Sequence, residues 1–303
     1  MDLGFGLPVA GEWATPEALV AVARRAEALG YRAVWTFQRL FYPVAPREEY
    51  YGAPGGPWPA AFASVMDPLA VLAFVAASTR MIRLGVSVLV MPLYQPIVLA
   101  KQLATLDVLS AGRLDVGLGL GWSSDEWEAA GASMARRGAR ADEFLRVLKA
   151  VWTEDPVEFS GEFYRVPRAH VAPRPVQRPH PPLLLGGYHP GVLRRAATLG
   201  DGYTGGNIPL AELTATVARV RDAAAAAGRD PARFPIVCRG SFNLTPEPLG
   251  APRRALWGSA GQIREDLRRY AEAGVTQVFL EPNFQPGGAQ LEGVLAQMDA
   301  LAP

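Results

Sequence analysis

Residues 82–118 read IRLGVSVLVMPLYQPIVLAKQLATLDVLSAGRLDVGL, and this stretch contains one complete strand–helix–strand unit. The apolar, β-branched run Ile82–Val90 predicts a buried strand. Pro96 is suited to the first turn of a helix, which we expect over Pro96–Leu109, and Leu114–Leu118 predicts the next strand. Buried strands separated by helices are typical of a parallel α/β sheet, so this unit indicates the fold class.

The same rhythm continues along the chain in both directions. Further strands are expected at Leu3–Pro8, Ala33–Trp35, Leu183–Leu185, Gly202–Thr204, Phe234–Cys238 and Val275–Leu280. Helices are expected from Pro16 to Leu29, then at Arg140–Trp152, Val192–Leu199, Leu210–Ala227, Ile263–Ala273 and Gln290–Leu301. Thr15 is a good N-cap for the first of these, and Ser259 with Gln262 forms a capping box for a helix that Gly274 ends.

Eight strands, nearly all followed by a helix, predict a single α/β domain over residues 1–303, a (β/α)8 TIM barrel with loop insertions after strands two and four. The alternative is a doubly wound open sheet. That fold needs fewer strands or two domains, and no linker-like segment divides this chain.

Two insertions interrupt the regular alternation. The segment Thr36–Met66 carries many aromatic residues among prolines and glycines, and a barrel places such a loop over its mouth. It either packs as a small core of its own, lines a substrate pocket, or does both. The segment Thr153–Pro181 contains Val157–Phe159 and Phe163–Val166, which predict a β-hairpin before a proline-rich return to strand five.

Composition excludes several classes of function. The chain has 303 residues, of which 50% are hydrophobic, and its net charge of +1 leaves no electrostatic footprint for nucleic acid. Cys238 is the single cysteine, so an internal disulfide is impossible, which suits a reducing cytoplasm. We see neither a signal-peptide pattern nor an apolar run long enough to span a bilayer, so we expect a cytoplasmic protein without a membrane partner.

Metal and hydrolase chemistry find little support. The three histidines, His170, His180 and His189, are not at metal-ligand spacing, so no metal site is expected. A Gly-x-Ser-x-Gly nucleophile turn is missing as well. The glycines of Gly117–Gly121 do not follow the Gly-x-Gly-x-x-Gly dinucleotide pattern, and they come four elements into the chain.

Glycines at two expected strand ends are better candidates for a binding site. Gly117–Gly121 suits either the close approach of a flat ring to the backbone or a tight barrel corner. The following Trp122–Glu126 supplies polar groups at the barrel mouth or forms the first turn of a helix. Gly186-Gly187 precedes an expected helix, whose N-terminus favours an anion.

At these residues the chain resembles the luciferase-like monooxygenase superfamily, and within it the coenzyme F420-dependent oxidoreductases. The resemblance covers most of residues 1–210. The matching segments are Arg83–Leu89, Leu106–Arg113, Gly117–Glu126, Arg137-Gly138, Phe159–Tyr164, Pro173–Pro175, Pro179–Pro182, Gly186-Gly187 and Gly200–Gly202.

The resemblance implies a barrel whose cofactor ring lies over strands three and four. It implies a bulge at Ser87–Val88 behind the ring, where we predict a cis peptide, and a phosphate site at Gly186-Gly187. Coenzyme F420 is the expected cofactor, with flavin mononucleotide (FMN) as the alternative. The residues expected at the cofactor are Thr36, Ser87, Val88, Gly119, Gly121, Trp122, Gly186, Gly187 and Tyr188. A homodimer is also implied, with the apolar helix Pro96–Leu109 as a candidate interface.

One departure from the family pattern concerns proton transfer. Many relatives carry an acidic residue and then a histidine after strand two, where this chain has Gln38-Arg39. Gln38 and Glu126 are the candidate catalytic residues, although the amide of Gln38 can only form hydrogen bonds. The candidate substrate contacts are Phe37, Arg39 and Trp58.

The anionic tail of F420 would need basic side chains near the barrel mouth. Arg39, Arg168 and Arg174 are candidates for the anionic tail of F420. Arg39 has a structural alternative, a surface or interface ion pair.

Three functions follow as hypotheses. The first is an oxidoreductase that transfers a hydride between F420 and a small organic substrate, with the protein supplying orientation and a dry site. The second is an FMN-dependent monooxygenase that uses molecular oxygen. The third is a non-catalytic barrel that binds a flavin.

Overall fold

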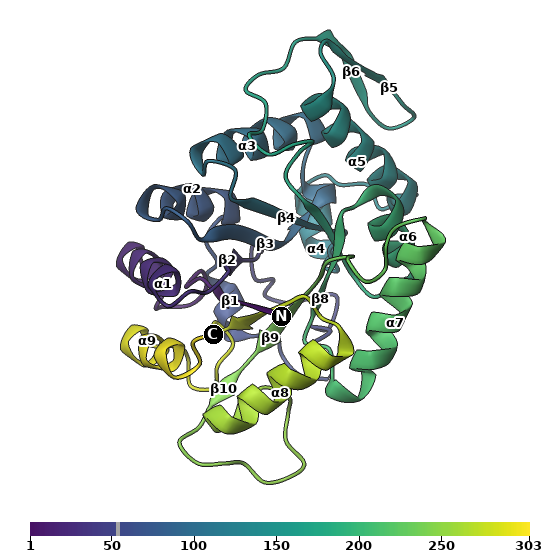
Figure 1. Cartoon of the computed structure of the whole chain (residues 1–303). Helices are drawn as coiled ribbons and strands as arrows, with labels where there is room; N and C mark the ends of the chain where they lie inside the picture. Colours follow the sequence, from purple (N-terminus) through teal and green to yellow (C-terminus); the bar gives the residue numbers. More distant parts are fainter. Residues whose placement is uncertain (53–54) are drawn as a thin grey trace.

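Eight parallel strands close into a barrel in the computed structural model, which describes residues 1–52 and 55–303 (Figure 1). Their order around the barrel is β1, β12, β9, β8, β7, β4, β3, β2. Their bounds are β1 (Asp2–Gly6), β2 (Ala33–Thr36), β3 (Arg83–Val90), β4 (Leu114–Gly119), β7 (Leu183–Gly186), β8 (Gly202–Gly206), β9 (Ile236–Ser241) and β12 (Gln277–Glu281). The predicted (β/α)8 barrel is confirmed, with small differences at the strand ends.

Helices form the outer layer of the barrel (Figure 1). Their bounds are α1 (Pro16–Ala28), α2 (Pro68–Ser78), α3 (Pro96–Leu109), α4 (Ser124–Ala129), α5 (Arg137–Thr153), α6 (Pro190–Leu199), α7 (Leu210–Ala226), α8 (Ala260–Ala273) and α9 (Leu291–Ala300). The predicted caps are confirmed. Thr15 accepts a hydrogen bond from the backbone of Ala18 at 3.2 Å, and Ser259 and Gln262 form the capping box of α8.

Helix α2 was not expected from the sequence. Its residues, PLAVLAFVAAS, are apolar on all sides, so they lack the polar face that identifies an amphipathic helix. The cap is ordinary, because the Asp67 carboxylate accepts a hydrogen bond from the Ala70 backbone at 2.9 Å. One apolar side chain, Phe74, is 47% exposed.

Smaller elements complete the fold. The predicted hairpin is confirmed as the antiparallel pair β5 (Val157–Ser160) and β6 (Arg165–Ala169), which lies beyond α3 and α5 at the outer edge of the molecule (Figure 1). A second short pair, β10 (Asn243–Leu244) and β11 (Trp257–Gly258), was not predicted. Two 3₁₀ turns, Ala60–Ala63 and Met91–Leu93, follow β2 and β3.

A bulge in β3 distorts the barrel wall at one place. Val86 pairs with Val116 and Leu89 pairs with Leu118, so Ser87 and Val88 lie opposite the single residue Gly117. The Ser87–Val88 peptide bond is cis, as predicted. A Cβ atom on Gly117 would lie 2.2 Å from the carbonyl oxygen of Val86, so only glycine fits beside the bulge.

Large side chains fill the inside of the barrel. Trp35 and Phe279 stack with their ring centroids 5.0 Å apart, and they form one buried cluster with Leu184 and Val237. These residues come from four different strands, so they meet across the barrel axis. Because successive residues of a strand alternate between its two faces, Arg239 points inward like Val237. The closed interior leaves the ends of the strands as the place for a ligand.

Candidate active site

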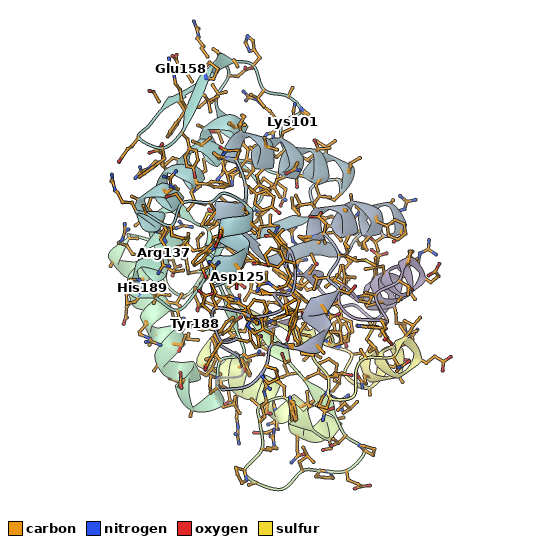
Figure 2. The ribbon with its side chains drawn as sticks, turned by 180° about the vertical axis from the view of Figure 1, so that it is seen from behind. Lys101, Asp125, Arg137, Glu158, Tyr188 and His189 are labelled. Carbon is orange, nitrogen blue, oxygen red and sulfur yellow. The ribbon has the colours of Figure 1, made fainter. Side chains whose placement is uncertain are left out.

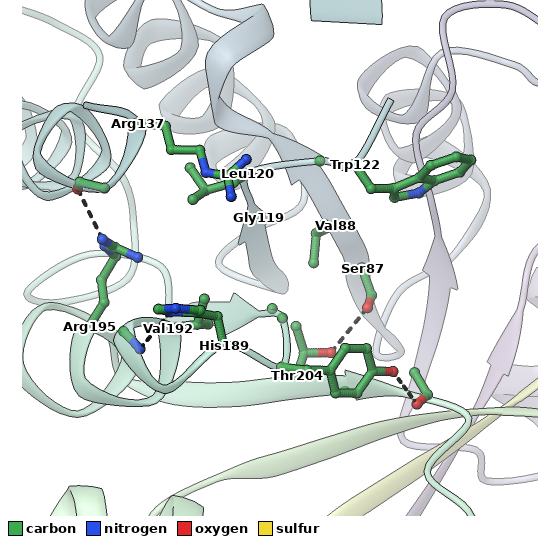
Figure 3. A pocket seen from close by; sticks show the side chains of 18 of the residues that line it. Ser87, Val88, Gly119, Leu120, Trp122, Arg137, His189, Val192, Arg195 and Thr204 are labelled. Carbon is green, nitrogen blue, oxygen red and sulfur yellow. Dashed lines mark hydrogen bonds between the residues drawn. The ribbon is translucent and has the colours of Figure 1, made fainter. Parts of the chain in front are cut away.

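A cavity of about 780 Å³ opens at the C-terminal ends of β3, β4, β7, β8 and β9 (Figure 3). This volume is within the usual range for cofactor and small-molecule sites. In a TIM barrel, this end of the strands carries the active site. The cavity has three chemically distinct parts, which are an apolar floor, a rim of cations and a roof of aromatic rings.

The floor is formed by the bulge and by glycines of neighbouring strands. Val88 projects between β4 and β7, where a Cβ atom on Gly119 or Gly186 would lie 2.7 or 2.8 Å from its methyl groups. The glycines therefore make room for Val88, and the floor presents no side chains around it. Ser87 and Thr204 are hydrogen-bonded, with 3.0 Å between their hydroxyl oxygens, and also line the cavity (Figure 3).

The cationic rim lies at the N-termini of α5 and α6. Arg137, His189 and Arg195 project there on one side of the cavity, with Trp122 on the other (Figure 3). Arg195 forms an ion pair with Asp142 and donates to the Gly138 carbonyl at 2.9 Å. Within the described residues, Arg137 forms no ion pair. Helix N-termini and free guanidinium groups both favour a bound anion.

Figure 2, which shows the molecule from behind, locates the cationic rim within the whole molecule. Arg137, Tyr188 and His189 lie together there, well apart from Glu158 on the β5–β6 hairpin and Lys101 on α3 (Figure 2).

The aromatic roof consists of Tyr51, Trp122 and Tyr188. The ring centroid of Tyr51 lies 6.0 Å from that of Trp122 and 6.3 Å from that of Tyr188. The Tyr188 hydroxyl donates to the Gly206 carbonyl at 2.6 Å, and burial raises the pKa of Tyr188 to about 12. This phenol therefore stays protonated at neutral pH.

Arg239, at the end of β9, is a buried cation in the cavity wall. The side chain is 7% exposed, and its Nη2 donates to the Tyr51 hydroxyl at 2.9 Å. Its Nε is buried and has no hydrogen-bond partner among the described residues. Burial alone would lower the pKa of Arg239, but Tyr51, Tyr50 and Glu281 favour its charged form and raise the pKa overall. The guanidinium is therefore charged.

Most residues expected at the cofactor line this cavity. They are Ser87, Val88, Gly119, Gly121, Trp122, Gly186, Gly187 and Tyr188. Thr36 does not belong to the lining. Its side chain is 1% exposed, and its hydroxyl donates to the Phe37 carbonyl at 3.4 Å.

The two candidate catalytic residues lie outside the lining. The Gln38 amide donates to the Tyr94 hydroxyl at 2.6 Å and accepts from the Val90 backbone at 2.8 Å, so both of its ends are engaged. One oxygen of Glu126 accepts from Arg39 at 2.6 Å and the other from the Leu40 backbone at 2.7 Å. Both side chains therefore hold the loop after β2 in place.

Arg39 corrects one expectation, because it forms a buried ion pair rather than a surface pair. The Arg39 and Glu126 side chains are 4% and 2% exposed, and the guanidinium carbon of Arg39 lies 4.5 Å from the centroid of Trp122. Burial raises the pKa of Glu126, although Arg39 acts in the opposite direction. Arg39 thus forms its ion pair with Glu126 and is not part of the cavity lining.

The other expected substrate residues pack inside the loop after β2. Phe37 contacts Phe62, with ring centroids 6.0 Å apart, and Trp58 contacts Trp122 at 4.6 Å. Neither Phe37 nor Trp58 lines the cavity. The described part of the loop therefore forms a small aromatic core and also supplies Tyr51 to the roof.

Two arginines proposed for the cofactor tail are also elsewhere. Arg168 is exposed on β6, and Arg174 donates to the Glu154 carbonyl at 2.6 Å. The cations of the cavity are instead Arg137, Arg194, Arg195 and Arg239. Sequence reasoning used Arg137 only as part of a matching segment and missed the other three arginines and Thr204, whereas Tyr51 belongs to the aromatic loop for which a pocket role was one of the expectations. Arg194 and Arg195 could have been found from the sequence, because they lie in the first turns of an expected helix that follows Gly186-Gly187.

Two absences apply to the described residues. None of their helices is both long enough and apolar enough to cross a membrane. No three or more His, Cys, Asp or Glu side chains in residues 1–52 and 55–303 are arranged to hold a metal ion.

Several known proteins are similar to this chain in sequence or in fold. A family described as luciferase-like monooxygenase matches residues 4–248. An uncharacterized protein of Mycobacterium tuberculosis is 31% identical over 283 residues, which cover 92% of this chain and 91% of that protein. The solved structure of the monooxygenase RslO1 from Streptomyces bottropensis aligns with a TM-score of 0.83 and 26% identity, covering 100% of this chain and 98% of that one.

Two relatives with named activities match shorter parts of the chain. An F420-dependent glucose-6-phosphate dehydrogenase of Kineococcus radiotolerans is 33% identical over 205 residues, which cover 66% of this chain and 56% of that enzyme. An FMNH(2)-dependent dimethylsulfone monooxygenase of Pseudomonas putida is 36% identical over 156 residues, which cover 50% of this chain and 42% of that enzyme.

Proposed function

The chain belongs to the luciferase-like monooxygenase family, whose members are oxidoreductases and monooxygenases, and from this we propose that it transfers a hydride between coenzyme F420 and a small organic substrate. The observation that carries the proposal is the floor of Val88 and its flanking glycines beside a cationic rim. A tricyclic ring with an anionic side chain needs both features in one cavity.

The floor fits the ring of a flavin or deazaflavin. Gly119 and Gly186 flank Val88 without side chains of their own, so the floor is apolar and free of protrusions. The Ser87 and Thr204 hydroxyls lie beside it and offer hydrogen bonds to polar edges of a ring. Such a surface positions a flat ring through contact area and orients it through a few polar groups.

The rim fits the anionic part of the cofactor. Arg137 lies free of carboxylates in the described structure, and the N-terminus of α6 adds a partial positive charge. Arg194 and Arg195 share one carboxylate, Asp142, so the rim keeps an excess of positive charge. F420 carries a longer anionic tail than FMN, and a rim of several arginines suits that tail.

The protein's contribution to the reaction is positioning and exclusion of water. Bound F420 supplies the hydride chemistry itself. Val88 would fix the height of the ring, while Tyr51, Trp122 and Tyr188 would cover the space in front of it. Holding two partners at reacting distance in a dry site is the main requirement for hydride transfer.

The competing function is an FMN-dependent monooxygenase. The similarity to the dimethylsulfone monooxygenase of Pseudomonas putida favours it, and both cofactors share a tricyclic ring and a ribityl phosphate. The floor and the helix N-termini suit either cofactor. The two functions therefore differ at the arginines of the outer rim and in the use of oxygen.

A cofactor titration tests the proposal. Oxidised and reduced F420 and FMN are titrated into the purified protein at fixed salt, and binding is followed by cofactor fluorescence. We expect F420 to bind more tightly than FMN. Submicromolar binding of FMN with no binding of F420 would contradict the proposal and favour the monooxygenase.

A further inference from the structure

A second charged site lies in the same cavity, away from the rim on α5 and α6. Its centre is Arg239, which projects inward from β9 toward the barrel mouth. Tyr51, Trp122 and Tyr188 surround this part of the cavity with aromatic rings, and the guanidinium carbon of Arg239 lies 5.6 Å from the ring centroid of Phe284. The surroundings are therefore mainly aromatic, and the Tyr51 hydroxyl is the side-chain group that accepts a hydrogen bond from the guanidinium.

The hydrogen bonds of Arg239 are incomplete. An arginine has five N–H donors. One is used by the Tyr51 hydroxyl at 2.9 Å, and the buried Nε has no partner among the residues that the structure describes. A buried donor without an acceptor is costly, so a ligand that supplies an acceptor would be stabilised.

Within the described residues, Arg239 has no ion-pair partner at short range, although the buried Glu281 favours its charged form from further away. No carboxylate of the described chain lies within ion-pair distance of it. The nearest acid on the neighbouring strand is Glu281, whose Oε1 accepts hydrogen bonds from Asn283. Arg39 cannot add to the site, because it is paired with Glu126 at 2.6 Å. Among the described residues, the site thus offers one cation without a direct ion-pair partner.

We propose that Arg239 anchors the carboxylate of a small organic acid, whose apolar body lies against Tyr51, Trp122 and Tyr188 as the substrate of the proposed reaction. The planar fork of a guanidinium group matches the two oxygens of a carboxylate. A single cation suits a singly charged carboxylate better than a doubly charged phosphate. This inference rests on the proposed function only in taking the anchored molecule as the substrate.

Benzoate and its neutral analogue benzamide are suitable probes, because they share a planar ring and differ in charge. Calorimetric titration of the wild-type protein should show benzoate binding at least tenfold more tightly than benzamide. Arg239→Met should abolish this preference, and Arg239→Lys should retain a weakened form of it. Circular dichroism establishes that each variant is folded.

A second cation serves as the matched control. Arg146→Met removes an exposed arginine of α5 that does not line the cavity and should leave benzoate binding unchanged. Equal binding of benzoate and benzamide to the wild type would overturn the proposal even if no Arg239 variant folds. Loss of benzoate binding in Arg137→Met but not in Arg239→Met would overturn it too, as would a preference for phosphate at Arg239.

Cofactor titrations on the same preparations separate the two proposals. If F420 or FMN binds and the preference for benzoate is missing, the carboxylate site is wrong and the proposed function stands. If neither cofactor binds and benzoate binds through Arg239, the proposed function is wrong and the carboxylate site stands.

Discussion

Arg39 and Glu126, 87 residues apart in the chain, form an ion pair at 2.6 Å with both side chains almost fully buried. The pair joins the loop after β2 to α4, beneath the aromatic roof of the cavity. Arg47 of the same loop pairs with Asp125, and Glu48 accepts a hydrogen bond from the Ser124 backbone at 2.9 Å. The roof is thus tied to the barrel by polar contacts at several points.

Breaking the buried pair should destabilise the protein strongly. Glu126→Leu leaves the Arg39 guanidinium buried without its counter-charge, and we expect a loss of about 3–5 kcal/mol in the free energy of unfolding. Urea denaturation followed by circular dichroism measures it. Asp299→Asn is the matched control, because it breaks the exposed pair with Arg25 and should cost less than about 1 kcal/mol. Equal losses in the two variants would contradict the assignment.

The glycine floor should not tolerate a methyl group. In Gly119→Ala, the new Cβ would lie 2.7 Å from Val88, so we expect a loss of about 1–3 kcal/mol in stability together with weaker cofactor binding. Adding Val88→Ala should restore part of the stability by making room. Gly293→Ala in α9 is the control, since nothing lies within 4 Å of its new Cβ. A neutral Gly119→Ala would show that Val88 moves aside freely.

Arg137 should contribute to cofactor affinity through its charge. Arg137→Met should weaken cofactor binding about 10–100-fold, as expected for the loss of a hydrogen bond between charged groups. The wild-type affinity should also fall more steeply with salt than that of the variant. Fluorescence titration measures both effects. Arg146→Met, on the exposed face of the same helix, should bind like the wild type.

Glu281 should make the stability depend on pH. Burial raises the pKa of its carboxyl above the ordinary value of 4.5, although Arg239 and Asn283 act against the rise. Between 4.5 and the raised pKa, the folded state keeps a proton that the unfolded state releases, so the free energy of unfolding falls as pH rises. Glu281→Gln removes this contribution and keeps an oxygen for Asn283.

To test the role of Glu281, the free energy of unfolding of the wild type and of Glu281→Gln is measured by urea denaturation from pH 4 upward, and its slope against pH is compared. The slope should become less negative in Glu281→Gln. Glu158→Gln is the control, because Glu158 is exposed on the β5–β6 hairpin and should leave the slope unchanged. Identical slopes in the wild type and Glu281→Gln would refute the role of Glu281.

We also propose that the protein is a homodimer through an apolar face of α2 and α3. Phe74, Val98 and Leu109 are 47%, 53% and 62% exposed there, which is unusual for large apolar side chains on neighbouring helices. Light scattering should give twice the 32.5 kDa of one chain, and Val98→Glu should shift it toward the monomer. A particle of 32.5 kDa at micromolar concentration would contradict the dimer.

The sequence predicted the barrel well because its strands and helices carry local signals. Helix α2 was not predicted, because its residues are apolar on all sides and therefore show no helical alternation of apolar and polar positions. Gly119 and Gly186 were correctly predicted to lie at the cavity. The sequence did not show why glycine is needed there, because the Val88 side chain that excludes a Cβ atom comes from a different strand.

The charged residues were harder to place for a similar reason. Arg239 is embedded in a buried strand, and its partner Tyr51 is 188 residues away. Arg39 was expected at the substrate or the cofactor tail, or in a surface or interface ion pair, because nothing near it in the sequence reveals that Glu126 reaches it inside the protein. Long-range pairs of this kind depend on how loops cross the barrel mouth, which local patterns do not record.

The cavity is built from three separate parts of the sequence. The floor and the cationic rim come from strands and helix ends between residues 87 and 206, the loop after β2 supplies Tyr51 to the roof, and β9 supplies Arg239. An engineer could therefore exchange this loop for one of different shape, keep Arg39 to meet Glu126, and leave the cofactor-facing block untouched. Such an exchange would change the shape of the space in front of the cofactor and keep Arg239, so it would alter which molecules fit without removing the charge that anchors them.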